Sequence, residues 1–155
     1  MGGKGKNQEN HLAIRKRIQY IQGDIEDMSF PDNSFDFLSM GYALRHISDL
    51  SVAFAEFHRV LKPGGRVCVL EITRPEGRIR TALMKAYFRN LVPALARLTA
   101  RDQDTALLWR YYWDTIEACA APQEVMRTLE NVGFTNVDRH LELGIFSEYR
   151  ADKAA

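Results

Sequence analysis

Three turns in the chain follow β-prone stretches and could place chemical groups at the ends of strands. They are Gly23-Asp24-Ile25, Met40-Gly41-Tyr42 and Glu71-Ile72-Thr73. In open α/β sheets, ligands bind where loops leave the carboxyl ends of the strands. We therefore expect a binding site built from these three turns.

The first turn has a form suited to a purine ring. A carboxylate just past a strand end, here Asp24, can accept a hydrogen bond from the exocyclic amine of adenine, and an apolar neighbour, here Ile25, can pack on the ring. Taken alone, Gly-Asp after a strand is more often only a turn. The segments around it decide between the two interpretations.

Hydrophobic spacing in the first half of the chain predicts the elements that position these turns. Short buried strands are expected at 19–22 and 35–40. Apolar residues recur at helical spacing over 49–62, and Pro63-Gly64-Gly65 ends that run. A nearly continuous apolar stretch at 67–72 is typical of a central strand. Strand, helix and strand in this order indicate a parallel crossover unit of an α/β fold.

The second half predicts a helical region followed by a closing strand pair. A basic and apolar stretch at 78–98, broken by Pro93, is expected to form two helical pieces and a lid. Further elements are a helix over about 104–118, a helix from Pro122 to a stop at Gly133, and antiparallel strands near 135–140 and 145–150.

Composition limits the classes of partner and the location. With 21 basic and 20 acidic side chains, the chain has no strong field for nucleic acid. Two cysteines far apart do not suggest a metal site or a disulfide scaffold. No apolar run reaches membrane-spanning length, so we expect a cytoplasmic protein. The polar residues 1–10 predict a disordered tail before one domain over 11–153.

Two blocks of sequence resemble a known family. They are GDIEDMSFPDNSFDFLSMGYALRHISD and FHRVLKPGGRVCVLEITRP. They resemble the class I S-adenosylmethionine-dependent methyltransferases that build ubiquinone and menaquinone, the UbiE family. In that family a Pro-Phe-Pro-Asp-Asn-Ser-Phe-Asp run and a Leu-Arg-Asn run stand where this chain has Ser29–Asp36 and Leu44-Arg45-His46. The resemblance extends more loosely over about 12–153.

The resemblance implies a Rossmann-like sheet, mostly parallel, with an antiparallel pair at its end and S-adenosyl-L-methionine as cofactor. It implies that Asp24 and Ile25 contact adenine and that Met40 and Gly41 line the cofactor near its methyl group. The family binds the rest of the cofactor on a Gly-rich loop after its first strand. We expect this chain to lack that loop and the first strands, and its methyl transfer to be impaired as a result.

Three residues lie where proton removal and acceptor binding are expected. Arg45 could hold a phenolate by charge-assisted hydrogen bonds, and His46 or a water could take the proton, with Tyr42 beside them. The family has asparagine at the position of His46, and a helix-entry role suits that histidine as well. A surface ion pair of Arg45 with Asp49 or Glu56 is an equally good alternative.

Aromatic and basic residues suggest contacts with an apolar acceptor. The rings of Trp109, Tyr111, Tyr112 and Trp113 cannot all face one way on a helix, so we expect ordinary packing for about half and substrate contact for Tyr112. The basic stretch 78–101 suits either an interfacial helix that meets a prenylated quinol at a membrane surface or a lid with a solvated edge.

Two functions from different classes follow. The first is methyl transfer to a small aromatic or quinol-like acceptor, by an enzyme or enzyme fragment. The alternative is a non-catalytic scaffold that keeps a methyltransferase-like fold to bind a partner. A nicotinamide-dependent oxidoreductase ranks last because its glycine fingerprint is absent. An exposed sheet edge would favour a homo-oligomer.

Overall fold

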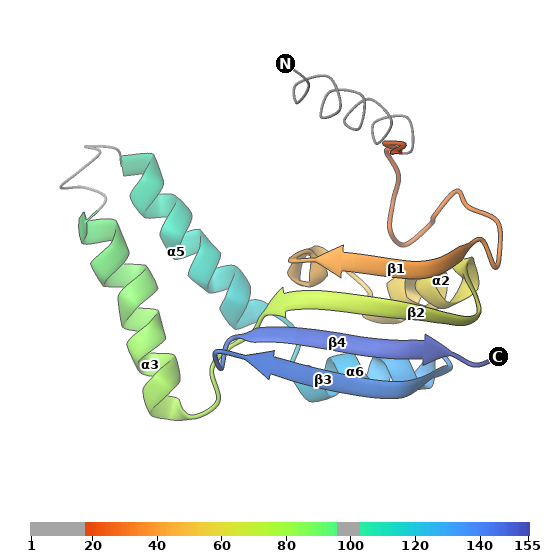
Figure 1. Ribbon diagram of the computed structural model, residues 1–155. Helices are drawn as coiled ribbons and strands as arrows, with labels where there is room; N and C mark the ends of the chain where they lie inside the picture. The colour runs from red at the N-terminus through yellow and green to blue at the C-terminus, as the bar shows by residue number, and fades with distance from the viewer. Residues whose placement is uncertain (1–17, 96–102) are drawn as a thin grey trace, which may run out of the picture.

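The computed structural model describes residues 18–95 and 103–155, which build one four-stranded sheet with helices packed on it (Figure 1). The strands are β1 (Phe35–Gly41), β2 (Leu61–Ile72), β3 (Phe134–Glu142) and β4 (Phe146–Lys153), in the order β1-β2-β4-β3. β1 and β2 are parallel, whereas β4 is antiparallel to both of its neighbours. The sheet is therefore mixed, and the predicted antiparallel pair at the end of the chain is confirmed.

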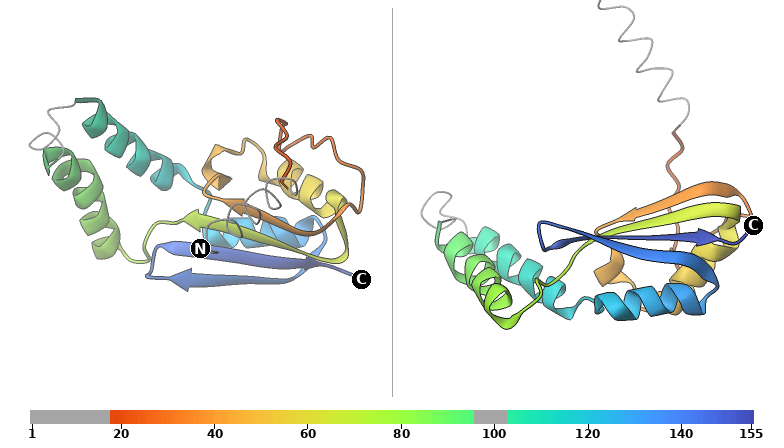
Figure 2. Two further views of the ribbon diagram at one scale, coloured as in Figure 1. Left: turned by 45° about the horizontal axis from the view of Figure 1, so that its top comes forward. Right: turned by 60° about the horizontal axis from the view of Figure 1, so that its bottom comes forward.

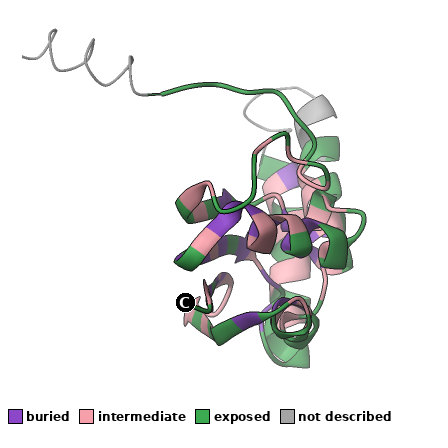
Figure 3. Cartoon of the chain, turned by 90° about the vertical axis from the view of Figure 1, so that its right-hand side faces the viewer, coloured by how far each residue is buried: buried purple, intermediate pink, exposed green. Residues whose placement is uncertain are grey.

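Two helices cover one face of the sheet. They are α2 (Leu50–Val60) and α6 (Pro122–Asn131), which lie on the same side in both views of Figure 2. The buried residues lie between these helices and the sheet (Figure 3), and Phe54, Phe57 and Leu129 are at most 1% exposed. In the described ranges no helix covers the opposite face.

Local sequence explains how α2 and α6 begin and end. The carboxylate of Asp49 accepts hydrogen bonds from the backbone N–H groups of Ser51 and Val52, which satisfies two groups at the start of α2. Pro122 occupies the first turn of α6, and Gly133 follows its end with a φ of 107°. The predicted boundaries of α6 are confirmed.

The turn between α2 and β2 requires glycine. Gly64 has a φ of 76°, and a Cβ added at Gly65 would lie 2.8 Å from the carbonyl oxygen of Lys62. β2 begins at Leu61, before this turn, because Leu61 already pairs with Phe35 of β1. The strand is therefore longer than the predicted 67–72, and it directly follows the helix.

A helical pair projects beyond the carboxyl end of β2. It consists of α3 (Arg78–Ala86), the π-helical turn η2 (Tyr87–Leu91) and α5 (Gln103–Ala118), and α3 and α5 lie side by side in Figures 1 and 2. The expected break at Pro93 takes the form of this π turn. Proline has no N–H, and its ring clashes with the carbonyl four residues earlier, here that of Arg89 inside η2.

Rings and ion pairs hold the two helices together. Phe88 contacts the rings of Trp109, Tyr112 and Trp113 with centroid distances of 5.7, 6.3 and 6.1 Å. Lys85 pairs with Glu117 at 2.9 Å. The name lid is used below for residues 78–95 and 103–118.

The strand predicted at 19–22 is wrong. These residues are exposed and form no strand, and Tyr20 is 92% exposed. Residues 19–22 do not pair with any strand of the described sheet, although one edge of β1 is open to them. The β-prone composition is not sufficient to form a strand. The predicted tail 1–10, and the end of the predicted helix at residue 98, lie outside the described residues.

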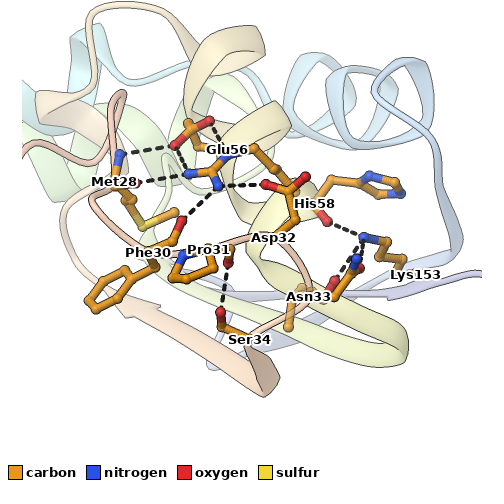
Figure 4. A network of polar contacts seen from close by, with 11 residues as sticks. Met28, Phe30, Pro31, Asp32, Asn33, Ser34, Glu56, His58 and Lys153 are labelled. Carbon is orange, nitrogen blue, oxygen red and sulfur yellow. Dashed lines mark hydrogen bonds and ion pairs between the residues drawn. The ribbon is translucent and has the colours of Figure 1, made fainter.

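One arginine clamps the loop that leads into β1 (Figure 4). Arg59 of α2 donates hydrogen bonds to the carbonyl oxygens of Met28 and Phe30, at 2.9 and 2.7 Å, and to the carboxylates of Asp32 and Glu56. Glu56 also accepts a hydrogen bond from the backbone N–H of Met28. The loop 28–32 is thus fixed to α2 at several points, which positions the preceding turn at Asp24.

This clamp predicts a pH dependence of stability. Hydrogen bonding to Arg59 lowers the pKa of Glu56 below its ordinary value of 4.5. A carboxyl group with a lower pKa in the folded state stabilises the fold above its unfolded pKa, and this contribution is lost as the pH falls. We expect the unfolding free energy of the wild type to fall more steeply than that of Glu56→Gln between about pH 5 and pH 3. Urea denaturation across this range measures both, and parallel pH profiles would refute the clamp's contribution.

Candidate functional site

A hollow of about 580 Å³ lies beside Asp24. Its walls come from Gln22–Ile25 and from the segment after β1, at Ala43, His46 and Ile47. One carboxylate oxygen of Asp24, Oδ1, accepts a hydrogen bond from the backbone N–H of Glu26 at 2.9 Å. Among the described residues, the other oxygen has no hydrogen-bond partner and is available to a ligand.

A second carboxylate fixes this turn against the carboxyl end of β1. Glu26 Oε1 accepts hydrogen bonds from the backbone N–H groups of Ser48 and Asp49, at 3.0 and 3.1 Å. These N–H groups lie between the short helix η1 (Leu44–His46) and α2. Because Glu26 holds them, the turn at Asp24 and the turn at His46 face the same hollow.

The turn after β1 places its three predicted residues in different surroundings. Met40 is 6% exposed and packs in the hydrophobic core, whereas a Cβ at Gly41 would meet no atom within 4 Å. Tyr42 has a φ of 58°, a left-handed conformation that is costly for a tyrosine. Its backbone N–H donates to the carbonyl oxygen of Leu70 at 2.7 Å. Strained backbone of this kind is concentrated at functional sites.

Arg45 forms a buried ion pair with Glu71. Its Nη1 donates to Glu71 Oε1 at 3.2 Å, and the two side chains are 7% and 0% exposed. Glu71 Oε1 also accepts the backbone N–H of Ile72 at 2.8 Å, and Oε2 accepts that of Arg45 at 3.4 Å. The alternative of a surface pair with Asp49 or Glu56 is wrong, because those carboxylates bind the start of α2 and Arg59 instead.

The ring of Tyr112 in the lid contacts the arginine of this ion pair. The guanidinium carbon of Arg45 lies 4.7 Å from the ring centroid of Tyr112. Trp113 is 0% exposed and donates its indole N–H to Glu117 at 3.1 Å, and Tyr111 is 56% exposed. Of the aromatic cluster, Tyr112 therefore joins Arg45, while both tryptophans pack on Phe88 of the lid.

The predicted residues thus form two groups. Asp24, Ile25 and His46 line one hollow. Arg45 and the lid residue Tyr112 contact each other at a second position. Tyr42 belongs to neither group, because it lines a smaller hollow of about 110 Å³ that includes Leu70 and Glu148 and neither Arg45 nor Tyr112. Met40 and Gly41 are the last two residues of β1, the strand that precedes both His46 and Arg45.

The sequence analysis missed Glu26 as a site residue, and it placed Glu71 in a strand-end turn without assigning it a partner. Glu71 is an acidic residue inside an otherwise apolar strand run, and a carboxylate that is buried in this way must find a partner. That signal was readable from the sequence. The backbone groups held by Glu26 lie 22 and 23 residues away, and no local pattern indicates them.

The fold and the site together indicate a class of protein. An α/β sheet with an open hollow at the carboxyl end of β1 and a buried arginine that contacts a helical lid fits the Rossmann-like methyltransferases. Residues 1–153 match the model of the ubiE/COQ5 methyltransferase family. The chain belongs to this family.

Two curated relatives are both named ubiquinone/menaquinone biosynthesis C-methyltransferase UbiE. The protein of Marinomonas sp. (strain MWYL1) is 31% identical over 150 residues, and that of Coxiella burnetii (strain Dugway 5J108-111) is 34% identical over 142. These matches cover 96% and 91% of this chain but only 59% and 56% of the relatives. The chain therefore spans less than two thirds of the length of either relative.

Solved structures confirm the fold. A SAM-dependent methyltransferase from Aquifex aeolicus aligns with a TM-score of 0.58 and 19% identity. The alignment covers 94% of this chain and 60% of that one. The Rossmann-like methyltransferase fold expected from the sequence is thus confirmed.

Proposed function

We propose that this chain carries the adenine-binding and acceptor-binding parts of an S-adenosyl-L-methionine-dependent C-methyltransferase for a small aromatic or quinol-like acceptor. The observation that carries the proposal is the hollow between Asp24 and His46, at the carboxyl end of β1, in a chain of this family. The names of the curated relatives agree with quinone biosynthesis.

The residues around Asp24 fit the adenine of the cofactor. The carboxylate oxygen that is not used in the turn can accept a hydrogen bond from the exocyclic amine. Ile25, Ala43 and Ile47 supply apolar walls for the ring, and Glu26 holds the backbone N–H of Ser48, the residue after Ile47. We therefore assign Asp24 and Ile25 to adenine, and Met40 and Gly41 to the strand end beside the rest of the cofactor.

Arg45 is the residue that we assign to the acceptor. The cofactor, when bound, supplies an electrophilic methyl group, so the protein must orient the acceptor and remove its proton. Arg45 Nη1 is held by Glu71, and within the described residues Nε and Nη2 have no hydrogen-bond partner. These two groups can stabilise a phenolate, which makes its ring carbon more nucleophilic.

The lid and the neighbouring turns complete the acceptor site. The ring of Tyr112 covers the Arg45 guanidinium, so an aromatic acceptor reaches it alongside or in place of that ring. His46 is exposed in the Asp24 hollow, where it or a water can accept the proton. Tyr42, which is 44% exposed, lies in the turn between β1 and η1.

A transfer assay with isotope-labelled cofactor and hydroquinone as acceptor tests this proposal. We expect Arg45→Lys to lower transfer by roughly 10²–10³-fold, since lysine cannot both pair with Glu71 and hold the phenolate. Tyr112→Phe, which keeps the ring, should retain most of the activity. Equal transfer by wild type and Arg45→Lys, or no transfer by the folded wild-type chain, would count against the proposal.

One observation favours a second candidate, a non-catalytic partner-binding module. β1 has a free edge within the described part of the chain, and Phe37 on this strand is 56% exposed. Unpaired edges bind further strands. The same edge supports a homo-oligomer, which light scattering would detect.

The lid surface supports a peripheral membrane contact at a cytoplasmic location. Ile79, Leu83 and Leu91 are 77%, 67% and 51% exposed and lie at helical spacing near the exposed Arg78 and Arg80. Such a surface suits a prenylated quinol in a membrane. Across the described residues, no helix has the length and apolar character needed to cross one.

A further inference from the structure

A separate hollow of about 380 Å³ shares no lining residue with the hollow at Asp24. It is bounded by the loop that follows β2, by Arg139 of β3, and by the segment that joins α5 to α6. Its volume falls in the range of small-molecule sites. None of the residues assigned to the cofactor or the acceptor lines it.

The floor of this hollow is polar although it is buried. Arg139, whose side chain is 12% exposed, donates through Nε to Ser147 Oγ at 3.0 Å and through Nη2 to Thr73 Oγ1 at 3.5 Å. Thr73 and Ser147 are 3% and 1% exposed and share a hydrogen bond of 2.8 Å. The guanidinium of Arg139 is therefore held in one orientation.

One more polar atom lies behind this floor without a partner. Tyr149, opposite Arg139 in the sheet register, is 0% exposed, and its hydroxyl makes no hydrogen bond in the described structure. Burial raises the pKa of this phenol, and the nearby Ser147 side chain lowers it in part, so Ser147 is the polar group nearest to serving as its partner. Buried donors without partners are uncommon in native proteins and call for an explanation such as a ligand or a bound water.

The protein already places a carboxylate on Arg139. Nη1 of Arg139 donates to Glu76 Oε1 at 3.2 Å, and the Glu76 side chain is 71% exposed. An exposed carboxylate on a nearly buried cation is weakly held, because water competes for it. Glu76 thus marks the position of an anion that a ligand can replace.

Charge and shape of the walls define the ligand. Two guanidinium groups, those of Arg74 and Arg139, and one carboxylate, that of Glu76, line the hollow. Burial raises the pKa of the Cys119 thiol to about 11, so this thiol adds no charge. Pro75 and Ile116 supply apolar walls.

We propose that this hollow binds a small aromatic carboxylic acid. Its carboxylate replaces that of Glu76 on Arg139, Arg74 adds a second positive charge, and the ring packs between the apolar walls. We commit to a carboxylate rather than a phosphate because Nη1 of Arg139 already pairs with the carboxylate of Glu76. The site does not depend on the proposed methyl transfer.

Titration of the full chain with benzoate, followed by ligand-observed NMR without cofactor, tests this proposal. We expect Glu76→Gln to bind benzoate several-fold more tightly than wild type, because the competing internal carboxylate is removed. Arg139→Gln should weaken binding by roughly tenfold or more, and Arg74→Gln by about threefold. The matched control is Arg127→Gln, on the exposed surface of α6, which should bind as the wild type does.

The results of the benzoate titration either support or overturn the proposed site. Tighter binding by Glu76→Gln supports the site even if Arg139→Gln fails to fold, because a merely structural ion pair would not predict a gain. Unchanged or weaker binding by folded Glu76→Gln overturns the proposal, as does absence of benzoate binding by the wild type. Inorganic phosphate that binds more tightly than benzoate would overturn the assignment to an aromatic acid.

Discussion

Replacement of Glu71 by alanine is expected to lower the free energy of unfolding by about 3–5 kcal/mol, because it leaves a buried guanidinium without its counter-charge. The side chains of Arg45 and Glu71 are 7% and 0% exposed, so water cannot take over the lost interaction without opening the lid. The same change removes the acceptors for the backbone N–H groups of Arg45 and Ile72. Urea denaturation measures the loss.

Two further variants test whether burial of the ion pair causes the loss of stability in Glu71→Ala. Asp138→Ala breaks the exposed pair with Arg150 on the open face of the same sheet, and it should change stability far less. A double variant, Arg45→Met with Glu71→Leu, should recover most of the stability lost in Glu71→Ala, since removing both charges avoids an unpaired one. Similar losses in Glu71→Ala and Asp138→Ala would contradict the buried pair.

Elements set by local patterns were predictable from the sequence. α2 follows from its apolar spacing and its Asp49 cap, and α6 from Pro122 and Gly133. The closing pair β3 and β4 follows from two β-prone stretches around Gly144, which has a φ of 73°. Each of these signals acts within a few residues, so no tertiary contact was needed to interpret it.

Features that depend on distant partners were harder to predict. The stretch 19–22 has strand-like residues, but it does not pair along the open edge of β1 or with any other described strand, and composition alone does not reveal this. The partner of Arg45 stands 26 residues away, and nearer carboxylates on the chain were equally plausible. The turn at Asp24 was expected at the end of a strand, but residues 19–22 form no strand, and the tie of this turn to the segment after η1 through Glu26 depends on the folded structure.

Asp24→Ala is expected to weaken binding of S-adenosylhomocysteine by roughly 10–100-fold, because a hydrogen bond to a charged group contributes about 1.5–3 kcal/mol. The variant also loses the turn contact with the Glu26 N–H. Asp24→Asn separates the two effects, since its amide oxygen can keep the turn while its NH₂ group faces the adenine amine as a second donor. Both Asp24→Ala and Asp24→Asn should therefore bind S-adenosylhomocysteine more weakly than the wild type does.

The most direct measurement is isothermal titration of the folded chain with S-adenosylhomocysteine. It compares wild type with Asp24→Ala and with Asp27→Ala, whose exposed side chain lies outside the hollow. We predict that wild type and Asp27→Ala bind alike and that Asp24→Ala binds at least roughly tenfold more weakly. Absence of binding by the folded wild-type chain, or equal binding by all three proteins, would contradict a cofactor site at Asp24.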